Sequence, residues 1–227
     1  MKVIKKPHCL GFIMDGNRRW AEEHGRPTLE GHMEGQRVFM ECVRFLRDEG
    51  ISHGVFYAFS TENWKRSEKE VEYLMYLFSK IFSELATTIG EEGVRVRIIG
   101  RREDFNESLQ IQMKEVEDKS KSYKDTTVWI ALSYGGRAEI IDAVNHAIEK
   151  RERVDESSFS QLLQTAELPD SDMIIRTSGE QRLSNFLPWQ SVYSEFYFIE
   201  KHWPALTKVD FEDILLQYAK RTRRHGA

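Results

Sequence analysis

The sequence has little cysteine and no excess of positive charge, and both shortages narrow its possible functions. Its two cysteines, Cys9 and Cys42, belong to no Cys-x-x-Cys pair or Cys/His cluster, so no zinc site is predicted. We expect two reduced thiols that are buried or partly buried. The formal net charge of -4 makes nucleic acid a poor candidate partner, because proteins that bind a duplex are usually basic.

Long hydrophobic runs are also missing. No run approaches the roughly 18 apolar residues of a membrane-spanning helix. The N-terminal stretch MKVIKKPHCLGFIMDG is interrupted by Pro7 and His8, and it lacks the apolar core and cleavage site of a signal peptide. We therefore expect a cytoplasmic protein that spans no membrane, with contact at a membrane surface left open.

Three common catalytic signatures are absent as well. The sequence has no G-x-x-x-x-G-K-[ST], so a P-loop nucleotide site is not supported. It has no G-x-G-x-x-G after a predicted strand, which argues against dinucleotide binding, and no G-x-S-x-G of a serine hydrolase. The chemistry must therefore be sought in other residue patterns.

Short apolar runs alternate with longer stretches of helical periodicity. The runs that predict strands are 9–14, 54–59, 94–100, 127–132, 172–176 and 195–200. The predicted helices are 34–49, 68–89, 104–121, 137–150, 157–166 and 210–223. Because the chain has no linker or repeat, this alternation predicts one α/β domain over residues 1–227, with a six-stranded, mostly parallel sheet flanked by helices.

Three polar turns follow strands of the predicted sheet. DGNRRW lies at 15–20, STENWKRS at 60–67 and RTSGEQRLS at 176–184. Carboxyl ends of parallel strands meet at one edge of a sheet, where ligands bind, so the turns should form one pocket. The arginines that would converge there are Arg18, Arg19, Arg66, Arg176 and Arg182. Guanidinium groups bind phosphate oxygens in pairs, which favours a diphosphate or polyphosphate ligand.

An acid in this basic pocket requires an explanation. Asp15 would repel phosphate unless a divalent cation lay between them. Mg²⁺ binds one or two carboxylates together with phosphate oxygens and water. Asp15 is therefore one candidate metal ligand, and Glu195, at the start of the sixth strand, is a second.

Each of these residues also has a purely structural interpretation. The Asp15-Gly16 dipeptide by itself is more typical of a plain turn. His32 can satisfy a helix start, and Trp20 and Trp64 can be core aromatics. The arginines of KRTRRHGA at 220–227 are interpreted as a solvated helix end. The three similar turns at one sheet edge favour the functional interpretation.

The predicted helix at 68–89 is unusually rich in large apolar residues, which cover more than one stripe of its surface. Two interpretations stay open. The helix is either buried on all sides in the core, or it packs on the sheet with one side and lines an apolar tunnel with the other.

Five motifs occur in order along the chain: IMDGNRRWA, YAFSTENWKRS, RIIGRREDF, YGGRAEI and IIRTSGEQRLSNFLPWQSVYSEFYF. From about residue 8 to 224, the sequence resembles the cis-prenyltransferases, isoprenyl transferases of the undecaprenyl diphosphate synthase type. The resemblance implies a homodimer that uses Mg²⁺ to add isopentenyl diphosphate to an allylic primer, farnesyl or geranylgeranyl diphosphate. The implied product is a cis-polyprenyl diphosphate such as undecaprenyl diphosphate, a lipid carrier of glycans.

The resemblance also implies roles for residues by their positions. Asp15 is implied as catalytic and, with Glu195, as a metal ligand. Asn63 matches a residue assigned to proton removal, although a diphosphate oxygen or water is a better base than an amide. The residues implied in substrate binding are Gly16, Asn17, Arg18, Arg19, Trp20, Thr28, His32, Ser60, Thr61, Glu62, Trp64, Arg66, Arg176, Arg182, Leu183 and Ser184.

The sequence departs from the family at a few positions. Thr28 stands where many relatives have arginine, so that either Arg26 or Arg18 compensates or the allylic diphosphate is held less tightly. Gln181 replaces a histidine. Trp129 and Thr126 lie near positions that limit tunnel depth in relatives. A non-catalytic partner subunit is the rival interpretation, but such relatives lack the aspartate of the first turn, which this chain keeps.

Overall fold

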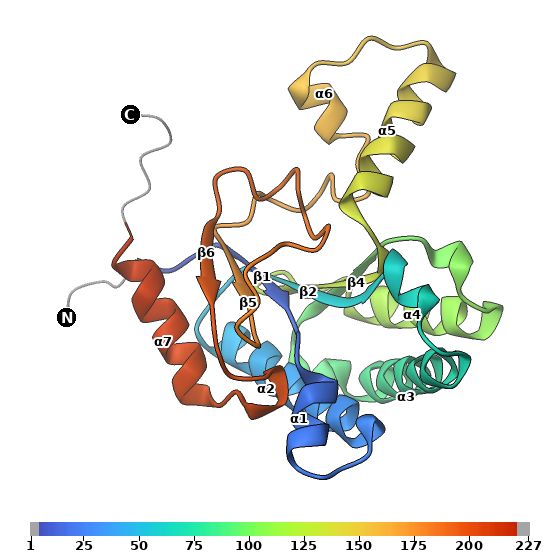
Figure 1. The fold of residues 1–227 in the computed structure, drawn as a ribbon. Coiled ribbons are helices and arrows are strands. Elements are labelled where there is room, and N and C mark those ends of the chain that lie inside the picture. Colours follow the sequence, from blue (N-terminus) through green and yellow to red (C-terminus); the bar gives the residue numbers. More distant parts are fainter. Residues whose placement is uncertain (1–4, 222–227) are drawn as a thin grey trace.

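A six-stranded sheet forms the centre of the computed structural model, which describes residues 5–221 except for the side chains of 88–91 (Figure 1). The strands are β1 (Cys9–Ile13), β2 (His53–Ser60), β3 (Arg95–Ile99), β4 (Thr127–Tyr134), β5 (Met173–Arg176) and β6 (Glu195–Phe198). Their order is β3-β4-β2-β1-β5-β6, and every neighbouring pair is parallel. The predicted parallel sheet is confirmed, with strand ends shifted by one or two residues.

Helices and short 3₁₀ turns connect the strands. The helices are α1 (Asn17–Glu23), α2 (Thr28–Asp48), α3 (Glu68–Glu92), α4 (Glu107–Ser120), α5 (Gly136–Lys150), α6 (Glu156–Ser160) and α7 (Lys208–Ala219). The 3₁₀ turns are η1 (Thr61–Lys65), η2 (Arg102–Asp104) and η3 (Trp203–Ala205). Within residues 5–221, no helix combines the length and apolarity needed to cross a bilayer.

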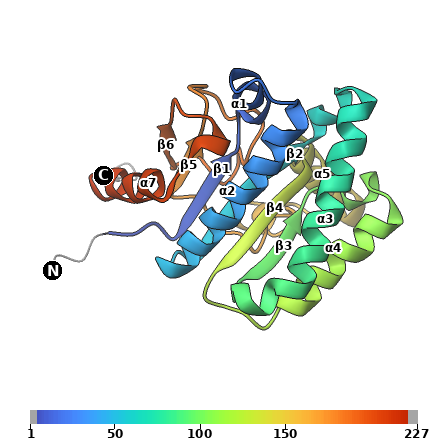
Figure 2. The ribbon, with the colours of Figure 1, turned by 90° about the horizontal axis from the view of Figure 1, so that it is seen from below.

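One face of the sheet is covered by α2, α3, α4 and α7 (Figures 1 and 2). Its core includes Phe12 of β1 stacked on Phe56 of β2, with ring centroids 5.0 Å apart, and Trp203 of η3 against Phe12. Side chains alternate in direction along a strand, so the neighbours of these residues point to the other face. The core cluster on the helical side is larger than the cluster on the other face of the sheet.

The second face is covered by turns rather than by the helix predicted at 157–166. Phe186 and Leu187 pack there against residues of the sheet such as Ile174. Helix α6 ends at Ser160, because the Thr165 N–H donates to the buried Glu139 carboxylate (3.0 Å) and so leaves the helical hydrogen-bond pattern. Tertiary contacts override a locally helical sequence here.

Two further differences concern helices near the N-terminus. Helix α1 was not predicted, and α2 begins at Thr28 rather than at residue 34. Gly31 and Gly35 weaken the helical pattern at the start of α2, but the close contact with α1 requires them. A Cβ at residue 31 would overlap the carbonyl oxygen of Asn17, and one at residue 35 would overlap its side chain.

Helix α7 ends at Ala219, whereas a helix to residue 223 was predicted. The arginines predicted as a solvated helix end fall mostly in 222–227, outside the described residues. Both cysteines are buried and unpaired, as expected.

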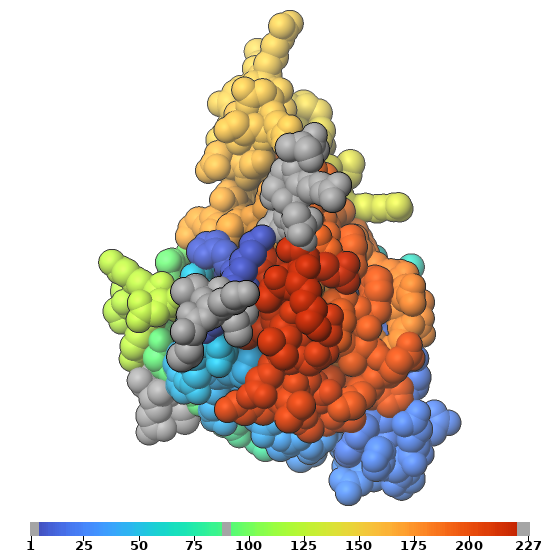
Figure 3. Space-filling model, turned by 90° about the vertical axis from the view of Figure 1, so that its left-hand side faces the viewer, coloured from blue at the N-terminus to red at the C-terminus, as the bar shows by residue number. Residues whose placement is uncertain are grey.

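Helices α5 and α6 form an arm that stands away from the sheet (Figures 1 and 3). In the space-filling view the yellow and gold atoms of this arm rise above the rest of the molecule (Figure 3). Ile141, Val144 and Ile148 lie three and four residues apart on α5 and are exposed. They form one apolar stripe along the helix.

Candidate active site

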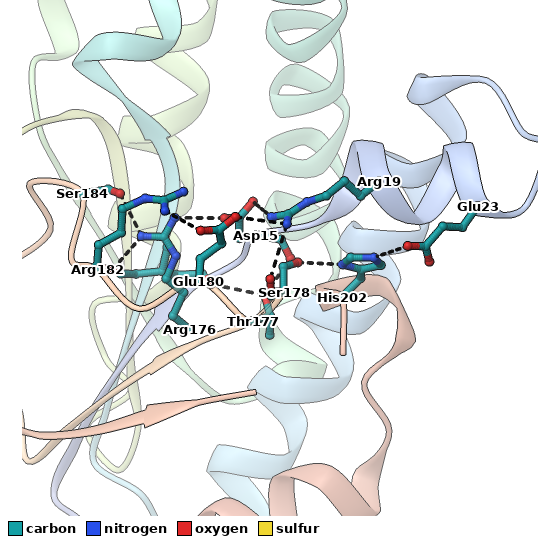
Figure 4. Close-up of polar contacts among 11 residues, drawn as sticks. Asp15, Arg19, Glu23, Arg176, Thr177, Ser178, Glu180, Arg182, Ser184 and His202 are labelled. Atoms are coloured by element: carbon teal, nitrogen blue, oxygen red, sulfur yellow. Dashed lines mark hydrogen bonds and ion pairs between the residues drawn. The ribbon is translucent and has the colours of Figure 1, made fainter. Parts of the chain in front are cut away.

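The three polar turns meet at the carboxyl edge of the sheet. Asp15 follows β1, Ser60 ends β2 and Arg176 ends β5. Ile13 of β1 lies in register with Arg176 of β5. The chain two residues later places Asp15 Oδ2 2.9 Å from Arg176 Nη2 (Figure 4). Sheet topology thus brings together an acid and a cation that are far apart in sequence.

The turn after β1 is fixed through its backbone. The Asp15 carbonyl accepts hydrogen bonds from Thr177 Oγ1 (2.6 Å) and from the Trp203 N–H (3.0 Å). Gly16 then adopts a φ of 105°, which side chains disfavour and glycine tolerates. The chain can therefore turn sharply out of the sheet and enter α1 at Asn17.

The Asp15 carboxylate is held ionised between two arginines. Arg19 Nη2 lies 3.3 Å from Oδ1, opposite the Arg176 contact (Figure 4). Burial alone would raise the pKa of Asp15, but the hydrogen bond and charge of Arg176, helped by Arg19, lower it below its usual value. The Arg176 side chain is almost fully buried, so this ion pair is poorly screened by solvent.

The five arginines predicted to converge do line the clefts at this edge. They share only three acidic partners. The ion pairs are Arg176–Asp15, Arg19–Asp15, Arg19–Glu180, Arg182–Glu180, Arg66–Glu70 and Arg18–Glu70. Guanidinium groups thus outnumber the carboxylates they contact, and this arrangement favours an anionic ligand.

Two clefts with shared walls hold these side chains. Their volumes are about 560 and 870 Å³, and Asp15, Asn17, His32 and Arg66 line both. The predicted residues that line either cleft are Asp15, Gly16, Asn17, Arg18, Arg19, Thr28, His32, Ser60, Glu62, Asn63, Arg66, Arg176, Arg182 and Ser184. Arg26 lines the larger cleft beside Thr28 and Arg18, as the expected compensation for the missing arginine requires.

Three buried polar atoms in the cleft walls make no hydrogen bond within the part of the chain that the structure describes. They are Asn17 Oδ1, His32 Nε2 and Arg176 Nε. An unsatisfied buried polar atom is costly and therefore uncommon in folded proteins. All three residues line the smaller polar cleft, so a polar ligand bound there would be able to satisfy them.

His32 is neutral at physiological pH. Burial is the main cause that lowers its pKa to about 4, and the charges of Arg66 and Arg18 act in the same direction, against that of Glu70. Its Nε2 lies 3.7 Å from Glu70 Oε1. A neutral imidazole donates one hydrogen bond to a ligand without adding charge to the cleft.

An apolar cavity of about 90 Å³ adjoins the smaller polar cleft. Met14, Tyr57, Ala58 and Leu74 line both spaces. Helix α3 contributes one wall of the cavity through Leu74, Leu77, Phe78, Ile81 and Phe82. The helix therefore packs on the core and also faces a cavity, whereas a tunnel long enough for a lipid chain stays a prediction.

Four residues predicted to bind substrate are not among those that line the two clefts. Trp64 packs in the core, where its Nε1–H donates to Ser133 Oγ (2.8 Å). Leu183 packs against the second core face, and Trp20 stacks on its helix neighbour His24. Thr61 lies beside Gly135. The contacts of Trp20 and Trp64 agree with their structural interpretation, and a substrate contact of any of the four residues stays a prediction.

Glu195 does not lie near Asp15 in the chain. It begins β6 and pairs in register with Met173, the first residue of β5, whereas Asp15 lies beyond the other end of the sheet. Its carboxylate is 3.4 Å from Arg221. Within this chain Asp15 and Glu195 therefore lie at opposite edges of the sheet, because the start of a parallel strand lies at the amino edge, and a metal-binding role for Glu195 stays a prediction.

Two further positions are separated from the apolar cavity. Trp129 packs on the second face of the sheet, and Thr126 donates to the Ile51 carbonyl (3.0 Å) before β4 begins. The β4 residue in the cavity wall is Ile130, whose side chain points to the helical face. Trp129 and Thr126 thus do not line this cavity, since neighbouring strand residues point to opposite faces, and their effect on tunnel depth stays a prediction.

Two acids of the site were not among the predicted residues. Glu70 contacts both Arg66 and His32, and Glu180 contacts both Arg19 and Arg182. Glu70 lies in the first turn of α3 and follows Arg66, which is extended just before that helix, by four residues. That spacing was the signal available for it in the sequence.

Asp15 is the described carboxylate best placed to hold a divalent cation. Its carboxylate reaches the clefts, yet nowhere in residues 5–221 do three or more His, Cys, Asp or Glu side chains form a metal-binding group. Mg²⁺ is commonly bound through one or two carboxylates together with substrate phosphates and water. The residues present therefore fit an ion that binds together with a diphosphate.

The chain is similar in sequence to proteins of one enzyme family. A family profile described as "Putative undecaprenyl diphosphate synthase" matches residues 13–226. An isoprenyl transferase of Thermotoga maritima is 45% identical over 228 residues, which cover 98% of both chains. A tritrans,polycis-undecaprenyl-diphosphate synthase (geranylgeranyl-diphosphate specific) of Methanocaldococcus jannaschii is 45% identical over 231 residues, covering 97% of this chain and 82% of the relative.

The fold is similar to two solved structures. Lavandulyl diphosphate synthase from Lavandula x intermedia, in complex with dimethylallyl diphosphate, has a TM-score of 0.93 at 31% identity, covering 98% of this chain and 99% of that one. A "probable undecaprenyl diphosphate synthase" from Campylobacter jejuni has a TM-score of 0.84 at 32% identity, covering 98% and 100%. Similarity of sequence and fold extends over almost the whole chain.

Proposed function

The chain belongs to the undecaprenyl diphosphate synthase family of isoprenyl transferases, and we propose that it joins isopentenyl diphosphate to farnesyl or geranylgeranyl diphosphate. The product would be a cis-polyprenyl diphosphate such as undecaprenyl diphosphate. The observation that carries this proposal is the convergence of Asp15 and five arginines in two adjoining clefts beside an apolar cavity.

Breaking the allylic carbon–oxygen bond leaves a delocalised cation and a diphosphate anion. Arg18, Arg19 and Arg26 surround the larger cleft and would stabilise the developing negative charge. His32, neutral and buried, would donate one hydrogen bond to the same group. Electrostatic stabilisation of this kind is usually the largest contribution to catalysis.

Asp15 would hold Mg²⁺ against the diphosphate. When bound, Mg²⁺ supplies positive charge to the leaving oxygens. Arg176 and Arg19 keep the carboxylate ionised and oriented until then. Because Asp15 pairs with these arginines in the structure, ligand binding would redistribute the contacts of all three side chains.

The double bond of isopentenyl diphosphate then attacks the allylic cation, and loss of a proton sets the new double bond. Asn63 Oδ1 already accepts a hydrogen bond from the Ser60 N–H (3.0 Å), which fixes the amide and occupies its oxygen. We therefore assign Asn63 to substrate orientation. A diphosphate oxygen or water is the proposed proton acceptor.

The hydrocarbon tail would enter the apolar cavity beneath α3. Burial contributes about 0.8 kcal/mol for each CH₂-sized group, so every five-carbon unit adds several kcal/mol to binding. The cavity of about 90 Å³ must widen as the tail grows. A long buried tail would also leave slowly, and a membrane surface is the proposed acceptor for it.

We also propose that the enzyme is a homodimer. The apolar stripe of Ile141, Val144 and Ile148 lies on the projecting α5–α6 arm, where a second copy of the chain would cover it (Figure 1). Exposed apolar stripes of this kind are typical of protein interfaces.

Labelled isopentenyl diphosphate tests the proposed reaction. The purified protein is incubated with Mg²⁺ and, in separate reactions, farnesyl, geranylgeranyl or dimethylallyl diphosphate, and the lipids are identified by mass. The expected result is extended cis-polyprenyl diphosphates with one of the first two primers and none in EDTA. Absence of incorporation with every primer would overturn the proposal.

A further inference from the structure

A chain of three polar side chains lies beneath the Asp15 turn. Ser178 Oγ is 2.7 Å from His202 Nδ1, and His202 Nε2 is 2.9 Å from Glu23 Oε1 (Figure 4). The three residues come from the loop after β5, from the residue before η3 and from the end of α1. The hydrogen bonds therefore join three separate segments around the site.

The arrangement has the order of a serine, histidine and acid triad but not the surroundings of a hydrolase site. Ser178 is buried, and its N–H already donates to the Lys201 carbonyl (2.9 Å). The next N–H, of Gly179, donates to the Ile199 carbonyl (2.9 Å). A hydrolase needs such N–H groups free to stabilise an oxyanion, so another role must account for the chain.

The partners fix the tautomer of the neutral histidine ring. A carboxylate only accepts hydrogen bonds, so Nε2 of His202 carries the proton that is donated to Glu23. In the neutral ring Nδ1 then accepts the hydrogen of Ser178 Oγ. The Ser178 hydroxyl is thereby held in one direction.

This hydroxyl and the imidazole pack directly on the Asp15 turn. A Cβ at Gly16 would overlap Ser178 Oγ and the ring of His202. Trp203, next to His202, donates its N–H to the Asp15 carbonyl (3.0 Å). The turn therefore rests on a support whose position depends on the bond between Ser178 and His202.

We propose that His202 is a positioning residue for isoprenyl transfer, which acts by holding Ser178 and the Gly16 turn so that Asp15 and the start of α1 face the diphosphate. This inference rests on the proposed role of Asp15. The bond to Ser178 is the important one, because Glu23 is mostly exposed and its contact is screened by solvent.

Variants of His202 separate its two contacts. The amide of His202→Asn reaches the position of Nδ1 and keeps the bond to Ser178, whereas that of His202→Gln extends toward Glu23. His202→Ala removes both, and Ser178→Ala removes the hydroxyl with little change in volume. His146→Ala on α5, which is exposed, is the matched control.

Two measurements are made on each full-length variant. The first is kcat together with the Mg²⁺ concentration that gives half-maximal rate. The second is amide hydrogen exchange over residues 15–20, which needs neither activity nor metal. We expect His202→Ala to lower kcat about tenfold to a hundredfold, to raise the Mg²⁺ requirement and to accelerate exchange locally. His202→Asn should recover most of each loss and His202→Gln little.

Two results would overturn the proposal. One is normal kcat and normal exchange in both His202→Ala and Ser178→Ala, whatever happens to the melting temperature. The other is a His202→Asn variant no better than His202→Ala. Where His202→Ala fails to fold, Ser178→Ala and His202→Asn decide the question. Asp15→Asn in the same assay separates the claims: a folded and active Asp15→Asn refutes the metal role, whereas a folded but inactive one beside normal His202 variants refutes only this inference.

Discussion

Asp15 has two roles in the structure: its carboxylate lines the clefts, and it also neutralises the charge of the buried Arg176. Its substitution must therefore be designed so that catalysis and stability can be separated. Asp15→Asn keeps the shape and a hydrogen-bond acceptor, but it loses the charge that Mg²⁺ and Arg176 require. Asp15→Ala removes the carboxylate that neutralises the buried Arg176, and loss of the partner of a buried charge is strongly destabilising.

We expect Asp15→Asn to lower kcat by at least about a hundredfold, the scale on which single electrostatic contacts contribute to catalysis. The measurement is isopentenyl diphosphate incorporation at saturating primer, with far-ultraviolet circular dichroism to verify the fold. Glu115→Gln is the control, because Glu115 lies on α4 and is not among the residues that line the two clefts. A folded Asp15→Asn enzyme at normal rate would contradict the role.

His32 should make stability depend on pH. The folded state lowers its pKa to about 4, mainly by burial, whereas the unfolded chain titrates near its ordinary value of about 6.5. Between these values the unfolded state binds more protons, so stability falls as pH falls from about 6.5 to 4. His32→Gln should flatten this part of the melting-temperature profile, whereas exposed His146→Gln should not. Identical melting-temperature profiles for wild type and His32→Gln would refute the assignment of this pH dependence to His32.

The positions of residues that follow a strand were predictable from the sequence, whereas the position of a residue that begins a strand was overlooked. Asp15, Arg66 and Arg176 follow strands, so their meeting at the carboxyl edge was predictable. Glu195 begins a strand, and its place at the amino edge follows from the same rule. The inward turn of Trp64 depends on Ser133, a residue that local sequence does not connect with it.

The side chains of helix α3 lie between the core and the apolar cavity. Phe82 is buried and lines the apolar cavity, whereas Tyr76 on the same helix is exposed. Phe82→Ala should enlarge the cavity, lengthen the products by one or more five-carbon units and destabilise the fold by about 3–5 kcal/mol. The measurements are product mass and urea unfolding.

Tyr76→Ala is the control for this change, since it shortens a side chain of α3 that does not line the cavity. It should leave product length unchanged. If Phe82→Ala is destabilised as expected but makes products of unchanged length, then this wall does not contact the growing tail.

Element ends show why periodicity alone was insufficient. Helix α2 begins six residues before its prediction because Gly31 and Gly35, poor helix formers, are needed where α1 crosses. Helix α6 is shorter than predicted because Thr165 bonds to Glu139. The sheet was easier to predict, since its central strands are buried on both faces and form continuous apolar runs.

At the scale of the whole molecule, the projecting α5–α6 arm is the feature that a single chain does not explain. Ile148→Lys places a charge in the exposed apolar stripe of α5 and should convert the proposed dimer to monomer. Val209→Lys, on an exposed position of α7, is the matched control. Light scattering after gel filtration measures both. A wild-type monomer, or an Ile148→Lys dimer as stable as wild type, would refute this interface.

The wall shared by the polar cleft and the apolar cavity has a consequence for how the number of added five-carbon units is determined. Met14, Tyr57, Ala58 and Leu74 border both spaces, so in the proposed reaction the diphosphate end of every intermediate would return to the same place while the hydrocarbon tail moves further into the cavity. Each isopentenyl unit would then be added in the same surroundings, whatever the length of the chain. Product length would be limited where the hydrocarbon tail reaches the end of its cavity.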